Sequence, residues 1–225
     1  TMNVCTLEQQ ALINRYKKLF GSNLQTMIQA KPTKDDLYTK IDKAIDMGVD
    51  FIQLMGSIAD RWARDGNAEL MQKCVDHTRR QGNPVGIGAH DVHTFYECDH
   101  IGLDPDFYFK TMHHDRYWSA IPKEHRIPYG VVHTLESKQN FYKDNMWCLF
   151  PEQTLEYVQK VKKPFIGYKV LAAGAIPAEE GFQYAFDNGA DFICVGMFDF
   201  QIVEDANHTI RCIKKAENRS RPWYG

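Results

Sequence analysis

The sequence predicts an α/β fold in which parallel strands alternate with helices, and three observations support this. Short apolar runs of strand length alternate along the chain with segments of roughly 10–15 residues whose apolar residues have helical spacing. A Gly-x-Asp-Phe-Ile phrase marks the junction from helix to strand at 48–52 and again at 189–193. The GxGxxG turn of dinucleotide-binding folds is absent, which weakens the alternative of an open sheet. We therefore expect a single TIM-type (β/α) barrel domain over residues 1–225, with about six βα units and an incomplete N-terminal part.

Each element is expected from its own local pattern. Residues 7–20 form an amphipathic segment that Thr6 can cap and Gly21 can end, and residues 1–6 are its approach. Similar glycine ends and proline starts bound the later helices, which are expected at 33–47, 67–81, 92–101, 151–163, 177–188 and 203–218. Strands are expected at 24–30, 50–56, 84–90, 106–113, 165–173 and 191–198. A long loop insertion fills 114–150, and loops of this length in compact domains are usually functional.

Composition restricts the partners of the protein. Hydrophobic residues make up 44% of the chain and charged residues 25%, as in ordinary globular proteins. The formal net charge of -2 gives no electrostatic basis for binding nucleic acid or an anionic membrane. No apolar run approaches the roughly 20 residues that span a bilayer. The six cysteines have no CxxC spacing, which favours free thiols in a reducing compartment. We expect a cytoplasmic protein with a small-molecule substrate; a homo-oligomer is left open.

Two lysines lie inside apolar runs of strand character, Lys110 in 106–113 and Lys169 in 165–174. A buried ammonium group is costly to desolvate, so such a lysine indicates either an ion pair or chemistry. Alternation along the strands predicts that His90, Lys110 and Lys169 face the barrel interior at the carboxyl ends of three neighbouring strands. The same alternation places Tyr108 inward and turns Tyr168 toward the helices.

Two ammonium groups in one pocket lower each other's pKa, and a neutral lysine amine can form a Schiff base with a carbonyl compound. The phrase Phe109-Lys-Thr111 and the run Lys169-Val-Leu-Ala-Ala-Gly-Ala-Ile176 resemble the paired lysine strands of deoxyribose-phosphate aldolase and related class I aldolases. The resemblance implies that Lys110 forms the Schiff base and that Lys169 tunes it, with no cofactor. His90 could then move protons. We expect a lyase that acts on a small polar carbonyl compound, such as a sugar or sugar derivative.

Other residues complete or compete with this site. Substrate binding is predicted for Gln53 on an inward strand position, for Trp118 as a stacking surface, and for Gly174 and Gly196, whose backbone N–H groups could meet an anion. A divalent metal is the main alternative, because nitrogen and carboxylate ligands follow two neighbouring strands. Its expected ligands are His90, Asp91, His113 and His114, and it would serve a sugar isomerase or epimerase. The strand lysines could instead be structural, and a non-catalytic binding protein on a barrel scaffold is the third alternative.

Overall fold

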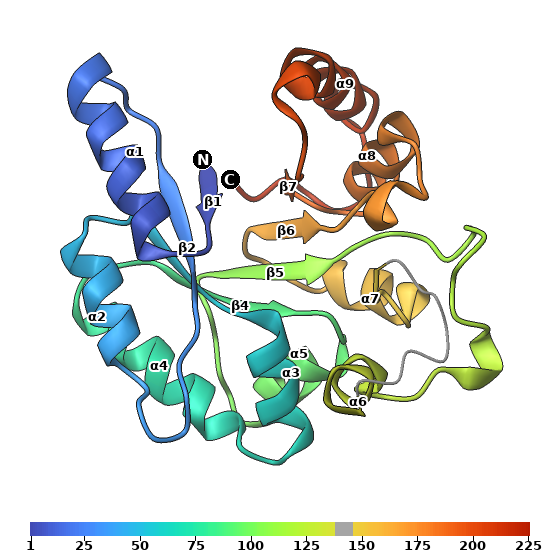
Figure 1. The fold of residues 1–225 in the computed structure, drawn as a ribbon. Coiled ribbons are helices and arrows are strands. Elements are labelled where there is room, and N and C mark those ends of the chain that lie inside the picture. The colour runs from blue at the N-terminus through green and yellow to red at the C-terminus, as the bar shows by residue number, and fades with distance from the viewer. Residues whose placement is uncertain (138–145) are drawn as a thin grey trace.

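The computed structural model describes residues 1–137 and 146–225, with the side chains of 134–137 left out. Its strands are parallel and pair in chain order into one sheet that curves into a nearly closed barrel with helices outside (Figure 1). The strands are β1 Met2–Val4, β2 Thr26–Ala30, β3 Phe51–Leu54, β4 Val85–Ala89, β5 Phe107–Thr111, β6 Phe165–Tyr168 and β7 Phe192–Cys194. This arrangement confirms the predicted α/β barrel fold.

The helices follow the strands, as a βα repeat requires. They are α1 Leu7–Phe20, α2 Thr39–Asp46, α3 Gly56–Arg64, α4 Ala68–Arg80, α5 His93–His100, α6 Gly130–Ser137, α7 Pro151–Val158, α8 Ala178–Asp187 and α9 Ile202–Lys215. Short 3₁₀ turns are η1 Lys123–His125, η2 Ala172–Gly174 and η3 Asp199–Gln201. The loop predicted at 114–150 contains η1 and α6, and its residues 138–145 lie outside the described part of the chain.

The bounds of several elements differ from the sequence prediction: helix 33–47 is Thr39–Asp46, strand 191–198 is Phe192–Cys194, and three further differences have a clear physical reason. Residues 2–4, expected as the approach to a helix, form β1, because they pair with Thr26–Ile28 of β2 rather than through a pattern of their own. The predicted strand 50–56 ends at Leu54, and α3 begins at Gly56, where no helix was expected. The strand predicted over 165–173 ends at Tyr168, because Lys169 adopts a left-handed conformation with φ 56°.

The recurring aspartate of the junction phrase has a structural role. Asp50 and Asp191 of that phrase directly precede β3 and β7, and Asp106 precedes β5 in the same way. Each carboxylate accepts the N–H of the first residue of the preceding strand, at distances of 2.7, 2.9 and 2.9 Å. Each backbone N–H donates to the carbonyl oxygen of that same residue. The aspartates therefore satisfy the first N–H of β2, β4 and β6, which explains why the phrase repeats.

The barrel interior holds an apolar cluster separate from the layer between sheet and helices. It contains Met27, Phe107 and Phe109, with Tyr168 among the partly buried residues packed on it. Tyr108 belongs to the outer layer. The faces predicted for β5 and β6 were therefore wrong, because both faces of β5 are apolar or aromatic and alternation cannot distinguish them. Gly86 shows that Phe107 faces the barrel interior. A Cβ at position 86 would lie 2.2 Å from the Phe107 ring, so the glycine leaves room for that ring.

The barrel opens between its two edge strands, β1 and β7. Side chains bridge the opening inside the barrel, where Asn3 Nδ2 lies 3.8 Å from Cys194 Sγ. Helices α1 and α9 stand on either side of it (Figure 1). Exposed apolar side chains of these two regions include Leu12, Leu19, Phe20, Phe198, Phe200 and Val203. Among the described residues, no helix has the length and apolar character needed to cross a bilayer.

Gly88 provides a test of how tightly the inner layer is packed. A Cβ at Gly88 would lie 2.0 Å from Gln53 Nε2 and 2.6 Å from the Leu54 carbonyl oxygen, so the backbone must shift. We expect Gly88→Ala to lower the free energy of unfolding by ~1–3 kcal/mol in urea denaturation. Gly196→Ala is the matched control, because nothing lies within 4 Å of its Cβ position. Equal midpoints for the two variants would contradict this packing.

Candidate active site

A buried carboxylate on α3 organises the end of β4. Asp60 is 0% exposed, and its Oδ2 lies 2.9 Å from His90 Nδ1. The carboxylate also accepts the backbone N–H groups of His90 and Asp91 and the hydroxyl of Thr94 at 2.7 Å. Because a carboxylate only accepts hydrogen bonds, His90 Nδ1 carries the hydrogen and Nε2 presents a lone pair. Asp60 therefore sets both the orientation and the tautomer of His90.

Sequence reasoning missed Asp60, although a signal was present. Its carboxylate lies within the buried stripe of α3, between Ala59 and Trp62. An aspartate at such a position is rare unless its charge is compensated by hydrogen bonds. Since α3 itself was not predicted, the stripe could not be read as a helix face.

The His90 ring is kept neutral by its surroundings. Burial is the largest effect and lowers the pKa of His90 below its ordinary value. The ammonium groups of Lys169 and Lys110 lower this pKa further, while hydrogen bonding and charge attraction from Asp60 oppose them. The result is a neutral imidazole whose Nε2 can accept a hydrogen bond or a proton.

Lys169 is the group that meets this lone pair. It follows β6, and its left-handed backbone turns the side chain toward His90, with Nζ 3.1 Å from His90 Nε2. Its Nζ also lies 4.4 Å from the centre of the Trp147 ring. A lysine with positive φ is uncommon, and such strain is concentrated at functional sites. Lys169 reaches the mouth of the barrel because the strand ends just before it.

Lys110 lies on the other side of His90 and is 1% exposed. Its Nζ donates to the His90 carbonyl oxygen at 2.6 Å, to Thr111 Oγ1 at 2.8 Å and to the Thr111 carbonyl oxygen at 3.0 Å. The structure therefore brings His90, Lys110 and Lys169 together, but the inward face predicted for Lys110 was wrong. It does so with Lys169 at the imidazole ring and Lys110 at the backbone behind it.

The four predicted metal ligands each have separate partners. Asp91 binds His93 Nδ1 at 2.6 Å and accepts the backbone N–H of Tyr129 at 2.7 Å. His113 contacts the carbonyl oxygens of His114 and Met146, and His114 Nε2 lies 3.0 Å from Glu180 Oε1. Within residues 1–137 and 146–225, no three His, Cys, Asp or Glu side chains are grouped so that they could hold a metal ion. The metal site therefore stays a prediction, and the described residues offer no set of ligands for it.

The predicted substrate-binding residues are dispersed. Gln53 is 2% exposed, and its Nε2 donates to the Leu54 carbonyl oxygen at 2.7 Å. Gly174 and Gly196 are exposed, and the Trp118 side chain is 80% exposed. From the same loop as Trp118, Trp147 is the aromatic residue that contacts Lys169. Sequence alone could not choose between them, because both are tryptophans with polar neighbours.

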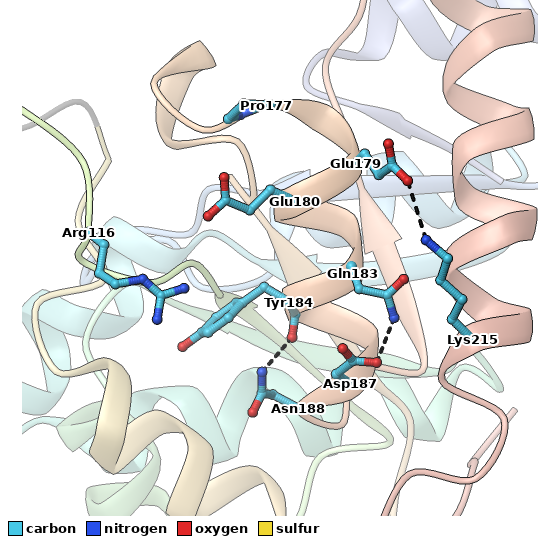
Figure 2. A pocket seen from close by; sticks show the side chains of 9 residues that line it. All are labelled: Arg116, Pro177, Glu179, Glu180, Gln183, Tyr184, Asp187, Asn188 and Lys215. Atoms are coloured by element: carbon cyan, nitrogen blue, oxygen red, sulfur yellow. Dashed lines mark hydrogen bonds and ion pairs between the residues drawn. The ribbon is translucent and has the colours of Figure 1, made fainter.

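A polar groove lies elsewhere on the barrel, on the outer side of α8 (Figure 2). It has a volume of about 560 Å³ and is bounded by Arg116, which follows β5, and Lys215 of α9. Its charged side chains pair locally, for example Glu179 with Lys215 at 3.3 Å. None of the residues predicted to be catalytic lines this groove.

Comparison with known proteins does not assign a family. The chain matches no protein-family model, and a search of curated proteins gives no match. The resemblance to class I aldolases therefore stays a prediction, whereas the barrel fold rests on the seven paired strands of the described residues.

The neutral state of His90 makes stability depend on pH. Its pKa is lowered in the folded protein, whereas the unfolded chain binds a proton near the ordinary value of about 6.5. The contribution of neutral His90 to folding stability is therefore fully present above pH ~6.5, and it is lost as the pH falls through the lowered pKa. We expect the free energy of unfolding to fall by up to ~1.4 kcal/mol per pH unit in this window. Urea denaturation at several pH values measures this, and an unchanged slope in His90→Gln would contradict it.

Proposed function

We propose that the protein is a lyase that forms a Schiff base between Lys169 and a small polar carbonyl compound, such as a sugar or sugar derivative. One observation carries the proposal: Lys169 Nζ lies 3.1 Å from the Nε2 lone pair of His90, whose other ring nitrogen is held by Asp60. An amine, an adjacent proton acceptor and a third group that orients the acceptor are the parts of an activated nucleophile.

The chemistry follows from this order of groups. Lys169 reacts in its neutral form: once its ammonium has given up one proton, the amine can still donate an N–H to His90 Nε2 and keeps its own lone pair for a carbonyl carbon. Attack gives a carbinolamine, and loss of water leaves a C=N bond between the substrate carbon and Nζ. The cation formed on protonation of this nitrogen can take up the electron pair of a breaking carbon–carbon bond. His90 accepts and returns the protons of these steps, and its lowered pKa makes the return favourable.

The hydrogen bonds of the two lysines determine which of them is the nucleophile in our proposal. The three donors of the Lys110 ammonium meet three oxygen acceptors, all buried, so its nitrogen has no lone pair directed at a ligand. Lys169 is half-buried and borders the mouth of the barrel beside Trp147. The roles implied by the resemblance are therefore exchanged in our proposal: Lys169 is the nucleophile.

Trp147 supports a sugar-like substrate. Its ring lies against Lys169 Nζ and meets the His90 ring edge to face, with centroids 5.5 Å apart. An aromatic face next to polar groups suits the C–H face of a polyol, while the hydroxyls meet hydrogen-bonding partners.

Reductive trapping tests the nucleophile. We expect borohydride, added with a panel of aldehydes and keto sugars, to fix one substrate covalently on Lys169, located by peptide mass spectrometry. Lys169→Met should abolish the adduct, and His90→Gln should slow its formation by ~10²-fold, because proton transfer is lost. An adduct on Lys110, or none with any compound of the panel, would sink the assignment.

Asp60→Asn tests the orienting role of the carboxylate. An asparagine keeps the shape but can donate toward His90, which favours the wrong tautomer, so we expect trapping on Lys169 to slow by ~10²-fold or more. Asp205→Asn is the matched control, because Asp205 is also buried, at 6% exposure, but lies on α9. Equal trapping rates in the two variants would show that Asp60 serves only stability.

A further inference from the structure

The ammonium of Lys110 is a buried junction between two strand ends and a returning loop. It binds the carbonyl oxygen of His90 after β4 and both oxygens of Thr111 at the end of β5. Its Nζ also lies 3.9 Å from Cys148 Sγ, in the segment that comes back from the loop after β5. Within the described residues, the partners of its Nζ are oxygens of His90 and Thr111 and the sulfur of Cys148, and none is a carboxylate. Backbone and hydroxyl dipoles therefore solvate this charge, and each dipole is held in place by it.

Thr111 extends the junction to Trp147. Its hydroxyl accepts from Lys110 and lies 2.9 Å from the His90 carbonyl oxygen and 3.2 Å from the Trp147 carbonyl oxygen. A hydroxyl has one hydrogen to give, and a carbonyl oxygen has two lone pairs, so Thr111 can direct its hydrogen to either oxygen. Within the described residues, Thr111 is the donor that the structure gives to the Trp147 oxygen. The path Lys110–Thr111–Trp147 thus consists of consecutive hydrogen bonds.

Trp147 is the residue whose position this path controls. Its ring contacts Lys169 Nζ, and the neighbouring Cys148 donates its N–H to His113 Nε2 at 3.2 Å. Both sides of Trp147 are therefore attached to the end of β5 and the residues that follow it. A displacement of this segment would move the aromatic ring relative to the amine.

We propose that Lys110 is a positioning residue, whose buried ammonium ties the ends of β4 and β5 to the Trp147 backbone and so sets the distance between the Trp147 ring and Lys169. The role of Trp147 against a substrate rests on the function proposed above. The placement of the ring by Lys110 does not.

The indole N–H resonances of the four tryptophans give a direct readout. Trp147→Phe identifies the Trp147 resonance. We expect Lys110→Met and Thr111→Val each to shift that resonance while the Trp62 and Trp223 resonances stay in place. Lys163→Met is the matched control, because Lys163 also donates to a backbone carbonyl, that of Pro105 at 2.7 Å, and should leave Trp147 unmoved. If Lys110→Met does not fold, Thr111→Val decides.

Trapping on Lys169 gives the second readout. We expect both variants to slow borohydride trapping of a substrate aldehyde by ~10- to 100-fold, as a misplaced reacting group does. A Trp147 resonance unmoved in Thr111→Val, or movement of all four resonances alike, would overturn the positioning role. If the wild-type protein forms no adduct while the Trp147 resonance still moves, the lyase proposal fails and the positioning role of Lys110 stands.

Discussion

The buried carboxylate of Asp60 is the interaction on which the arrangement of the strand ends depends. A charge with no exposure to water is tolerable only when its oxygens accept enough hydrogen bonds. The donors come from the backbone after β4, from Thr94 on α5 and from the His90 ring, so α3, β4 and α5 meet at one group. What satisfies the charge also orients the imidazole. Stability and the chemistry of the site are thus served by the same bonds.

The two lysines differ because one lies within a strand and the other lies beyond one. Lys110 keeps the register of β5, faces the outer layer and finds three fixed acceptors. Lys169 follows the last residue of β6, and its positive φ reverses the direction that alternation would give. Lys110 and Lys169 both lie next to His90, as their places in neighbouring strand segments predict. The end of β6 at Tyr168 determines that Lys169, and not Lys110, faces the barrel mouth.

The fold could be predicted because its signals are local and repeated. The aspartates of the junction phrase bind the first N–H of a neighbouring strand, so the chemistry that recurs in the sequence is the chemistry that joins the strands. The convergence of His90, Lys110 and Lys169 was also predictable from strand order. The faces of β5 and β6 were not, since they depend on space that Gly86 leaves for Phe107 across the sheet. Asp60 and Trp147 were missed because their roles arise from tertiary contacts.

In our proposal, the position of Trp147 depends on the buried charge of Lys110, which does not contact a substrate. If the Lys110 ammonium were the nucleophile of the proposed reaction, its nitrogen would need an open side, yet the acceptors around it are buried and fixed. Held by these acceptors, the Lys110 ammonium lowers the pKa of His90 and, through Thr111, fixes the position of the Trp147 backbone. A buried cation can therefore contribute to a site by ordering its dipoles, which is why a lysine in a strand need not be the reactive one even when it lies beside the reactive groups.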